Sequence, residues 1–140
     1  MEILVIDGQG GGMGARLVEG IKRISAEATV AAVGTNVIAT QAMLRAGADH
    51  GATGENAVCF GCRRADIIVG PVGIAIADSL WGEISPVMAA AVGQSPAAKI
   101  LIPVNQCSNI IAGASDIPQA KLVEYALEEI RKRLEIKDKV

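Results

Sequence analysis

The sequence predicts an α/β protein: a three-layer α/β/α sandwich of the Rossmann-like type, built around a parallel sheet of about five strands. Short apolar runs, typical of strands covered on both faces, alternate along the chain with segments whose apolar residues recur at helical spacing. Strands and helices that alternate in this way form parallel sheets with right-handed crossovers. The length of 140 residues suits a single domain, residues 1–140, and no low-complexity linker or internal repeat divides it.

The predicted strands are the apolar runs between turn residues. The first is expected over residues 2–7 (EILVID) and the second over residues 28–34 (ATVAAVG). Residues 48–54 (ADHGATG) are only weakly apolar and fit either a very short strand or a loop. A buried strand is expected over residues 66–69, where a Gly-Pro pair breaks it, and the last strand over residues 99–104.

Helices are expected between these strands and after the last one, because capping residues precede apolar residues at helical spacing. The spacing is clear after the glycine-rich stretch, where Leu17, Val18, Ile21 and Ile24 form one face. Residues 74–84 fit both strand and helix periods, so their structure stays open. The expected start signals of the later helices are Thr35-Asn36, Thr53, Ser85-Pro86 and Pro118.

The composition argues against nucleic acid and membranes as partners. The net charge is −2 at pH 7, whereas a nucleic-acid-binding protein needs a basic face to displace counterions. One Trp, one Tyr and one Phe leave almost no side chains for base stacking. No apolar run approaches the roughly 18 to 20 residues that span a bilayer, and the N-terminus lacks a signal sequence, so we expect a cytoplasmic protein.

The composition also favours self-association. Hydrophobic residues make up 51% of the chain but aromatic residues only 2%, because the excess lies in Ala, Val and Ile. We therefore expect apolar helix faces beyond those that one small core can bury. We expect a homo-oligomer rather than a monomer, and twofold dimers are the commonest form.

The stretch VIDGQGGGMGARLVEGI, residues 5–21, places five glycines within seven positions between the first strand and the first helix. A helix N-terminus offers a phosphate bare backbone amides and a favourable dipole, and glycines let the backbone come close. A plain strand-to-helix turn, the alternative interpretation, needs only one or two glycines. The residues expected to bind a ligand here are Gly8, Gln9, Gly10, Gly11, Gly12, Met13 and Gly14.

Several nucleotide-binding patterns fit this loop. Gly10-x-Gly12-x-x-Ala15 matches the dinucleotide fingerprint, and the glycines also fit the spacing of short-chain dehydrogenases. A P-loop is excluded, because no Lys-Ser/Thr pair follows Gly14. Two observations argue against an NAD(P)-dependent oxidoreductase. The position expected to carry a ribose-binding acid reads Gly34-Thr35-Asn36, and Tyr125 lacks the Lys four positions later that short-chain dehydrogenases use.

The carboxyl ends of parallel strands meet at one edge of a sheet, where ligands bind. Glycine and polar residues follow the predicted strands at that edge. Asp7, Asp78 and Glu83 are the acids near it and the candidates for acid–base catalysis, although Asp78 and Glu83 can also be ordinary capping or solvated residues. The other ligand-binding residues expected are Asn36, Gly70, Pro71, Gly73 and Asn105, the last of which can instead merely turn the chain.

The cysteines and the histidine do not predict a metal site. Cys59 and Cys62 have the C-x-x-C spacing, but they lie within a predicted helix and not at its start, where redox pairs lie. Cys107 is far away in the sequence, and a structural zinc would also need His50 to reach four ligands. We therefore expect the cysteines to be small buried residues and His50 to be a surface or capping residue. No metal is expected.

Four stretches together resemble a family of short bacterial proteins known as domain of unknown function 3842. They are VIDGQGGGMG, GADHGATGENAV, RRADIIVGPVGIAIADSLWGEISPVMAAAVGQS and KILIPVN, and they cover nearly the whole chain. The resemblance implies membership of the family and no particular activity.

A more distant likeness is to the lysine-decarboxylase-like (LOG) group of Rossmann-like proteins, which act on or sense nucleotides. That group has a glycine-rich Met-Gly loop that opens a helix, here Gly10 to Gly14 with Ala15. Its later Pro-Gly-Gly-x-Gly-Thr-x-x-Glu phosphate motif is matched only by Gly70-Pro71-Val72-Gly73 and a displaced Glu83. The missing Gly-Thr pair argues against the nucleoside-monophosphate hydrolysis of that group.

The sequence thus favours a protein that binds a phosphorylated, nucleotide-type small molecule at the glycine-rich loop, with catalysis left open. The cofactor stays unidentified, and a nucleotide or dinucleotide is the expected kind. Two alternatives remain, a non-catalytic oligomeric sensor or structural module and an NAD(P)-dependent oxidoreductase.

Overall fold

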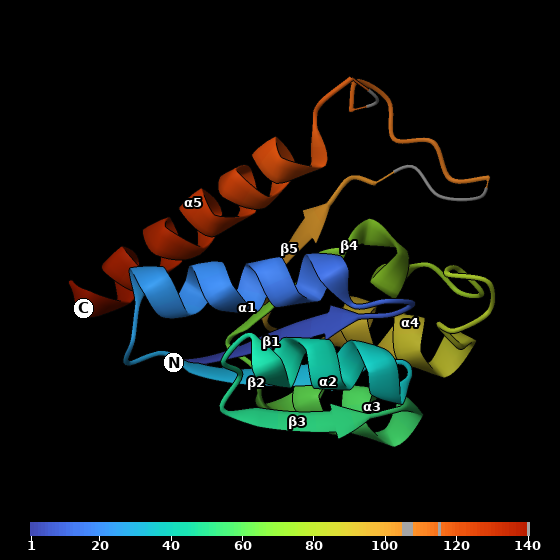
Figure 1. Ribbon diagram of the computed structural model, residues 1–140, viewed down its shortest axis with the longest axis horizontal. Helices are drawn as coiled ribbons and strands as arrows, with labels where there is room; N and C mark the ends of the chain where they lie inside the picture. The colour runs from blue at the N-terminus through green and yellow to red at the C-terminus, as the bar shows by residue number, and fades with distance from the viewer. Residues whose placement is uncertain (105–107, 115, 140) are drawn as a thin grey trace.

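The computed structural model describes residues 1–104, 108–114 and 116–139. Its centre is a five-stranded parallel sheet in the order β3-β2-β1-β4-β5, flanked by helices on both faces (Figure 1). This is the predicted α/β Rossmann-like fold, in which the strand order reverses between β1 and β4. The strands are β1 (Glu2–Asp7), β2 (Thr29–Gly34), β3 (His50–Thr53), β4 (Ile67–Pro71) and β5 (Ala98–Ile102).

Two groups of helices cover the two faces of the sheet. Residues of α1, α2 and α5 share one apolar core with the sheet, and residues of α3 and α4 share the other (Figure 1). A short 3₁₀ helix, η1 (Val72–Ala75), follows β4 directly. The helices are α1 (Gly12–Ile24), α2 (Val37–Arg45), α3 (Glu55–Arg64), α4 (Pro86–Gln94) and α5 (Gln119–Asp138).

The continuous apolar run of β1 follows from this layered arrangement. Ile3 and Val5 pack into one core, while Leu4 and Ile6 pack into the other. Each such side chain, when fully buried, contributes about 1.5–3 kcal/mol to folding. Between its charged first and last residues, Glu2 and Asp7, β1 is wholly apolar, and the carboxyl edge of the sheet begins at Asp7.

The structure resolves two local expectations that the sequence left open and corrects the bounds of two strands. Residues 50–53 form a strand and not only a loop, and every residue of this edge strand is exposed. The fourth strand runs through Gly70-Pro71 instead of breaking before it, because Pro71 is its last residue. The fifth strand ends at Ile102, two residues earlier than expected. The ambiguous stretch 74–84 is neither helix nor strand beyond the end of η1, but a series of turns.

The helix starts agree in part with the expected capping residues. Asn36 caps α2 by accepting a hydrogen bond from the Ala39 amide at 2.9 Å, and Ser85 caps α4. The residue before α3 is Gly54 and not Thr53, and its φ of 101° lies in the region that favours glycine. Within the described part of the chain, no helix combines the length and the hydropathy that crossing a membrane requires.

Candidate functional site

The glycine-rich loop joins β1 to α1 at the carboxyl edge of the sheet. Its backbone turns sharply, with positive φ at Gln9 (50°) and Gly11 (73°), and the Gly11 amide donates to the Gly8 carbonyl at 2.9 Å. Three of the five glycines are required by packing. A Cβ atom would lie 2.6 Å from Thr35 Oγ1 at Gly8, 2.7 Å from the Cα of Ala39 at Gly11 and 2.6 Å from Met43 Sδ at Gly14.

At positions 10 and 12, by contrast, packing does not require a glycine. A Cβ atom at either position would meet no heavy atom within 4 Å, and both residues are exposed. Neither has a φ in the left-handed region. Their lack of side chains therefore leaves open space above the loop.

Asp7 closes the loop from the sheet side. Its carboxylate is only 6% exposed and accepts hydrogen bonds from the Gly8 amide at 2.8 Å and the Gly14 amide at 2.7 Å. Burial raises the pKa of Asp7 although these two hydrogen bonds lower it, and the nearby charge of Glu83 raises it further. The buried acid thus occupies two of the amide donors that an anion could have used.

Glu83 fastens the outer side of the loop to the end of β2. Its carboxylate accepts hydrogen bonds from the Gln9 amide at 3.1 Å, the Thr35 hydroxyl at 2.8 Å and Asn36 Nδ2 at 2.6 Å. Burial alone would raise the pKa of Glu83, but the hydrogen bonds from Thr35, Asn36 and Gln9 outweigh it and bring this pKa below its usual range. The carboxylate therefore stays ionised and holds three segments together.

Asn36 takes part in the same network with both ends of its amide. Nδ2 donates to Glu83 and also to the Gln9 carbonyl at 2.9 Å, while Oδ1 accepts from the Ala39 amide. The side chain thus has internal partners for both of its amide protons. Dinucleotide-binding proteins carry a ribose-binding acid at the position that Asn36 occupies here. In this protein the Asn36 side chain instead shapes the glycine-rich loop.

A cavity of about 220 Å³ lies over the loop, between the ends of β1 and β4. This is the point at which the strand order reverses and at which open α/β sheets bind their ligands. Across residues 1–104, 108–114 and 116–139, the amides of Gly10, Gly12 and Met13 donate to no protein acceptor. The cavity is lined by residues 7–13, Arg16, Pro71, Leu80, Val104 and Gln119.

Arg16 brings a positive charge to this cavity. It lies in the first turns of α1, is exposed, and donates from Nη1 to Gln119 Oε1 at 3.4 Å. Sequence reasoning did not single it out. The signal was available, since an arginine four positions after Gly12 in a helix must lie one turn above the loop on the same face.

The other residues expected at the site lie in different surroundings in the structure. Pro71 lines the cavity, but Gly70 and Gly73 do not. Both are explained by packing, because a Cβ atom at Gly70 would meet the Ile6 carbonyl oxygen and one at Gly73 would lie 3.0 Å from Ser79 Oγ. Asp78 is exposed in a turn, where its amide donates to the Ile84 carbonyl at 2.7 Å. Asn105 lies outside the described residues, and so does Cys107.

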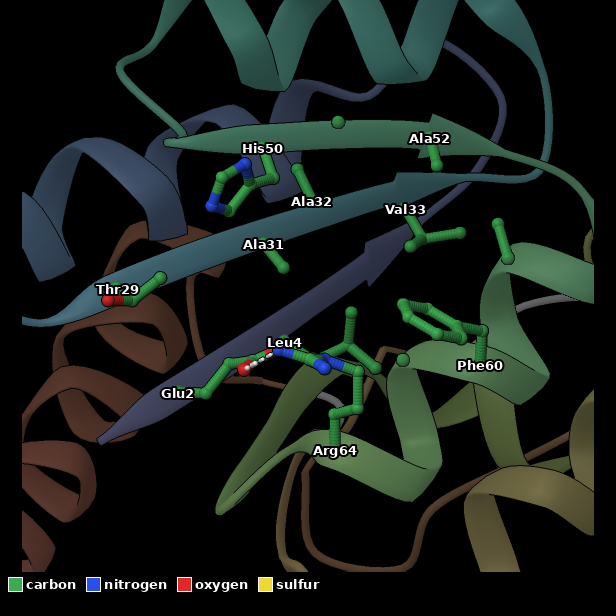
Figure 2. A pocket seen from close by; sticks show the side chains of 13 residues that line it. Glu2, Leu4, Thr29, Ala31, Ala32, Val33, His50, Ala52, Phe60 and Arg64 are labelled. Atoms are coloured by element: carbon green, nitrogen blue, oxygen red, sulfur yellow. Dashed lines mark hydrogen bonds and ion pairs between the residues drawn. The ribbon is translucent and has the colours of Figure 1, made fainter.

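A larger cavity of about 480 Å³ lies beside β3, between β2 and α3 (Figure 2). Figure 2 shows Ala31, Val33 and Ala52 on its strands, with the Phe60 ring at its side. Its arginine, Arg64, is already paired with Glu2 at 3.2 Å. This mostly apolar hollow with an internally neutralised charge does not suit a phosphate.

The C-x-x-C pair lies in α3, as expected. Cys62 is buried, and desolvation raises the pKa of its thiol to about 11, so the thiol stays protonated and inert at neutral pH. Cys59 is half-buried. In the described part of the chain, no three His, Cys, Asp or Glu side chains gather closely enough to hold a metal ion.

Comparison with known proteins places the chain in a family without supplying an activity. No curated protein matches the sequence. The crystal structure of a dodecameric FMN-dependent UbiX-like decarboxylase from Escherichia coli O157:H7 is similar to it, at 12% sequence identity and a TM-score of 0.48 over 96% of this chain and 94% of that chain. The family model described as Domain of unknown function (DUF3842) matches residues 2–135, and the chain therefore belongs to that family.

Proposed function

We propose that this protein binds a phosphorylated small molecule of the nucleotide type at the glycine-rich loop. The phosphate would accept hydrogen bonds from the amides of Gly10, Gly12 and Met13. It would also form an ion pair with Arg16. Helix N-termini bind anions in this way because their first amides point outward and the helix dipole favours negative charge.

One observation carries the proposal, namely the division of the loop amides into two sets. The amides of Gly8, Gln9 and Gly14 are held by the internal acids Asp7 and Glu83. The amides of Gly10, Gly12 and Met13 have no protein acceptor, and the first two belong to glycines that packing does not require. A loop with only a structural role would give no reason for those two glycines.

The cavity also limits what chemistry the site can support. Of the three acids considered for catalysis, Asp7 alone lines it, because Glu83 is engaged behind the loop and Asp78 is exposed in a turn. If the bound molecule reacts, Asp7 is therefore the group placed to exchange a proton with it. Burial raises the pKa of Asp7 above its ordinary value, and both carboxyl oxygens accept hydrogen bonds from loop amides.

The alternatives are less well supported. The ribose of a dinucleotide would have to compete with Glu83 and Gln9 for the Asn36 amide. A purely structural module leaves the open glycines without a reason. A homodimer and a cytoplasmic location, both expected from composition, are part of the proposal.

Calorimetric titration of the protein with inorganic phosphate, ribose 5-phosphate, AMP and NAD tests the proposal. We expect measurable binding of at least one phosphorylated compound and none of adenosine, which lacks the phosphate. Failure of all four compounds to bind at millimolar concentration would overturn it.

Arg16→Gln is expected to weaken binding of the phosphorylated ligand by about 10- to 100-fold, because a hydrogen bond to a charged group contributes about 1.5–3 kcal/mol. The side chain is exposed, so unfolding free energy should change by less than about 0.5 kcal/mol. Arg23→Gln in the same helix removes the same charge away from the cavity and serves as the control. Equal affinities for the two variants would remove Arg16 from the site.

A further inference from the structure

The protein's one tryptophan lies in the turns between η1 and α4. Trp81 is 91% exposed, so its ring packs against almost nothing. The preceding residue, Leu80, is 2% exposed and lines the cavity over the glycine-rich loop. Glu83, two residues after Trp81, accepts a hydrogen bond from the Gln9 amide of that loop. The indole is therefore attached to a segment that meets the cavity at Leu80 and the back of the glycine-rich loop at Glu83.

The backbone of this segment adopts conformations that side-chain-bearing residues avoid. Asp78, Leu80 and Trp81 have φ values of 64°, 56° and 57°, in the left-handed region. Hydrogen bonds from the Gly82 amide to the Asp78 carbonyl at 3.1 Å and from the Glu83 amide to the Leu80 carbonyl at 3.1 Å maintain the turns. Non-glycine residues persist in this region only when their surroundings hold them there, and they concentrate at ligand-binding sites.

The cavity is too small to enclose a whole nucleotide. Its volume of about 220 Å³ is below the range of roughly 300–1,000 Å³ typical of pockets that bury complete ligands. With the phosphate on the loop amides, the flat ring at the other end of the ligand must extend past the mouth. Trp81 directly follows Leu80, which lines the cavity, so its backbone lies within about 3.8 Å of a Cα atom of the cavity wall.

The other aromatic side chains lie elsewhere. Phe60 lines the cavity beside β3, and Tyr125 lines a hollow between β5 and α5. We propose that Trp81 is the stacking surface for the base or other flat ring of the ligand, which assigns the ligand to phosphorylated compounds that carry an aromatic ring. This inference rests on the proposed function, because the phosphate on the loop fixes the position of the ring.

Tryptophan fluorescence tests the inference directly, because all of the signal comes from Trp81. AMP at saturating concentration is expected to quench and shift this emission, whereas ribose 5-phosphate, which lacks the base, should leave it unchanged. By calorimetry, Trp81→Leu should weaken AMP binding by about tenfold and leave the affinity for ribose 5-phosphate unchanged. Tyr125→Leu, which removes another exposed aromatic ring, should alter neither affinity.

The outcomes separate this inference from the proposed function. If AMP and ribose 5-phosphate bind equally well and Trp81→Leu changes neither affinity, the stacking role is wrong and the phosphate site stands. If Trp81→Leu instead changes the oligomeric state seen by size-exclusion chromatography and leaves AMP binding intact, Trp81 is a subunit contact and the inference is overturned. If inorganic phosphate binds but AMP does not, the stacking role alone fails. If none of inorganic phosphate, ribose 5-phosphate, AMP and NAD binds the unmodified protein, the phosphate site and the stacking role fail together.

Discussion

Gly12→Glu is expected to lower the affinity for phosphate and AMP by more than about 100-fold while the protein stays folded, since the lost charge-assisted hydrogen bonds contribute about 1.5–3 kcal/mol each. A Cβ atom at this position would meet no neighbouring atom within 4 Å, and Gly12 lines the cavity and is exposed, so the new side chain can extend into open space. There it would cover the free amides and repel an incoming anion. Gly12 is also the first residue of α1, where a negative charge is favoured by the helix dipole.

The stability of this variant separates loss of binding from loss of fold. We expect its thermal midpoint to equal or slightly exceed that of the unmodified protein, because an acid in the first turn of a helix contributes about 0.3–1 kcal/mol. Gly93→Glu is the matched control, since Gly93 is an exposed helical glycine with open space around it in α4. Unimpaired AMP binding by Gly12→Glu would show that the loop is not the phosphate site.

Glu83→Gln is expected to lower the free energy of unfolding by about 2–4 kcal/mol, because it weakens several hydrogen bonds to a charged group at once. The Gln amide nitrogen would face the Gln9 amide or Asn36 Nδ2, which are donors themselves. Chemical denaturation measures the change. Glu135→Gln, at an exposed site in α5, removes the same charge and should change stability by less than about 0.5 kcal/mol.

The pH dependence of that difference follows from the direction of the pKa shift. The pKa of Glu83 is lowered in the folded protein, so its stabilising effect is fully present above its ordinary value of 4.5 and is lost as the pH falls through the folded pKa. The stability gap between the unmodified protein and Glu83→Gln should therefore narrow below about pH 4.5. Asp7 shifts in the opposite direction but is present in both proteins, and its effect largely cancels. A stability difference that widens as the pH falls would contradict the hydrogen-bond network assigned to Glu83.

The layered fold was predictable because each central strand reads as an uninterrupted apolar run and each helix has one apolar face. The elements that the sequence did not predict are those whose structure does not depend on such patterns. The strand β3 is short and exposed along its whole length, so its residues show no burial period. The turns around Leu80 and Trp81 place non-glycine residues at positive φ, for which the sequence carries no signal.

The glycine-rich loop was identifiable as a candidate site, but its internal division was not. Which glycines are needed for packing depends on α2 and on Met43 and Thr35, residues distant in the sequence. The contact between Gln9 and Glu83 spans 74 positions, and no local pattern reveals it. Asn36 and Glu83 therefore look like ligand-binding or catalytic candidates in the sequence, whereas the structure engages both in holding the loop.

The central claim is that three free amides and Arg16 receive a phosphate, and amide chemical shifts measured during a titration with AMP test it most directly. With ¹⁵N-labelled protein we expect the largest shifts at Gly10, Gly12 and Met13, and smaller ones at Gly8 and Gly14, whose amides Asp7 already holds. Saturating AMP that leaves the loop amides unmoved, or that shifts only residues beside β3 and α3, would contradict the account.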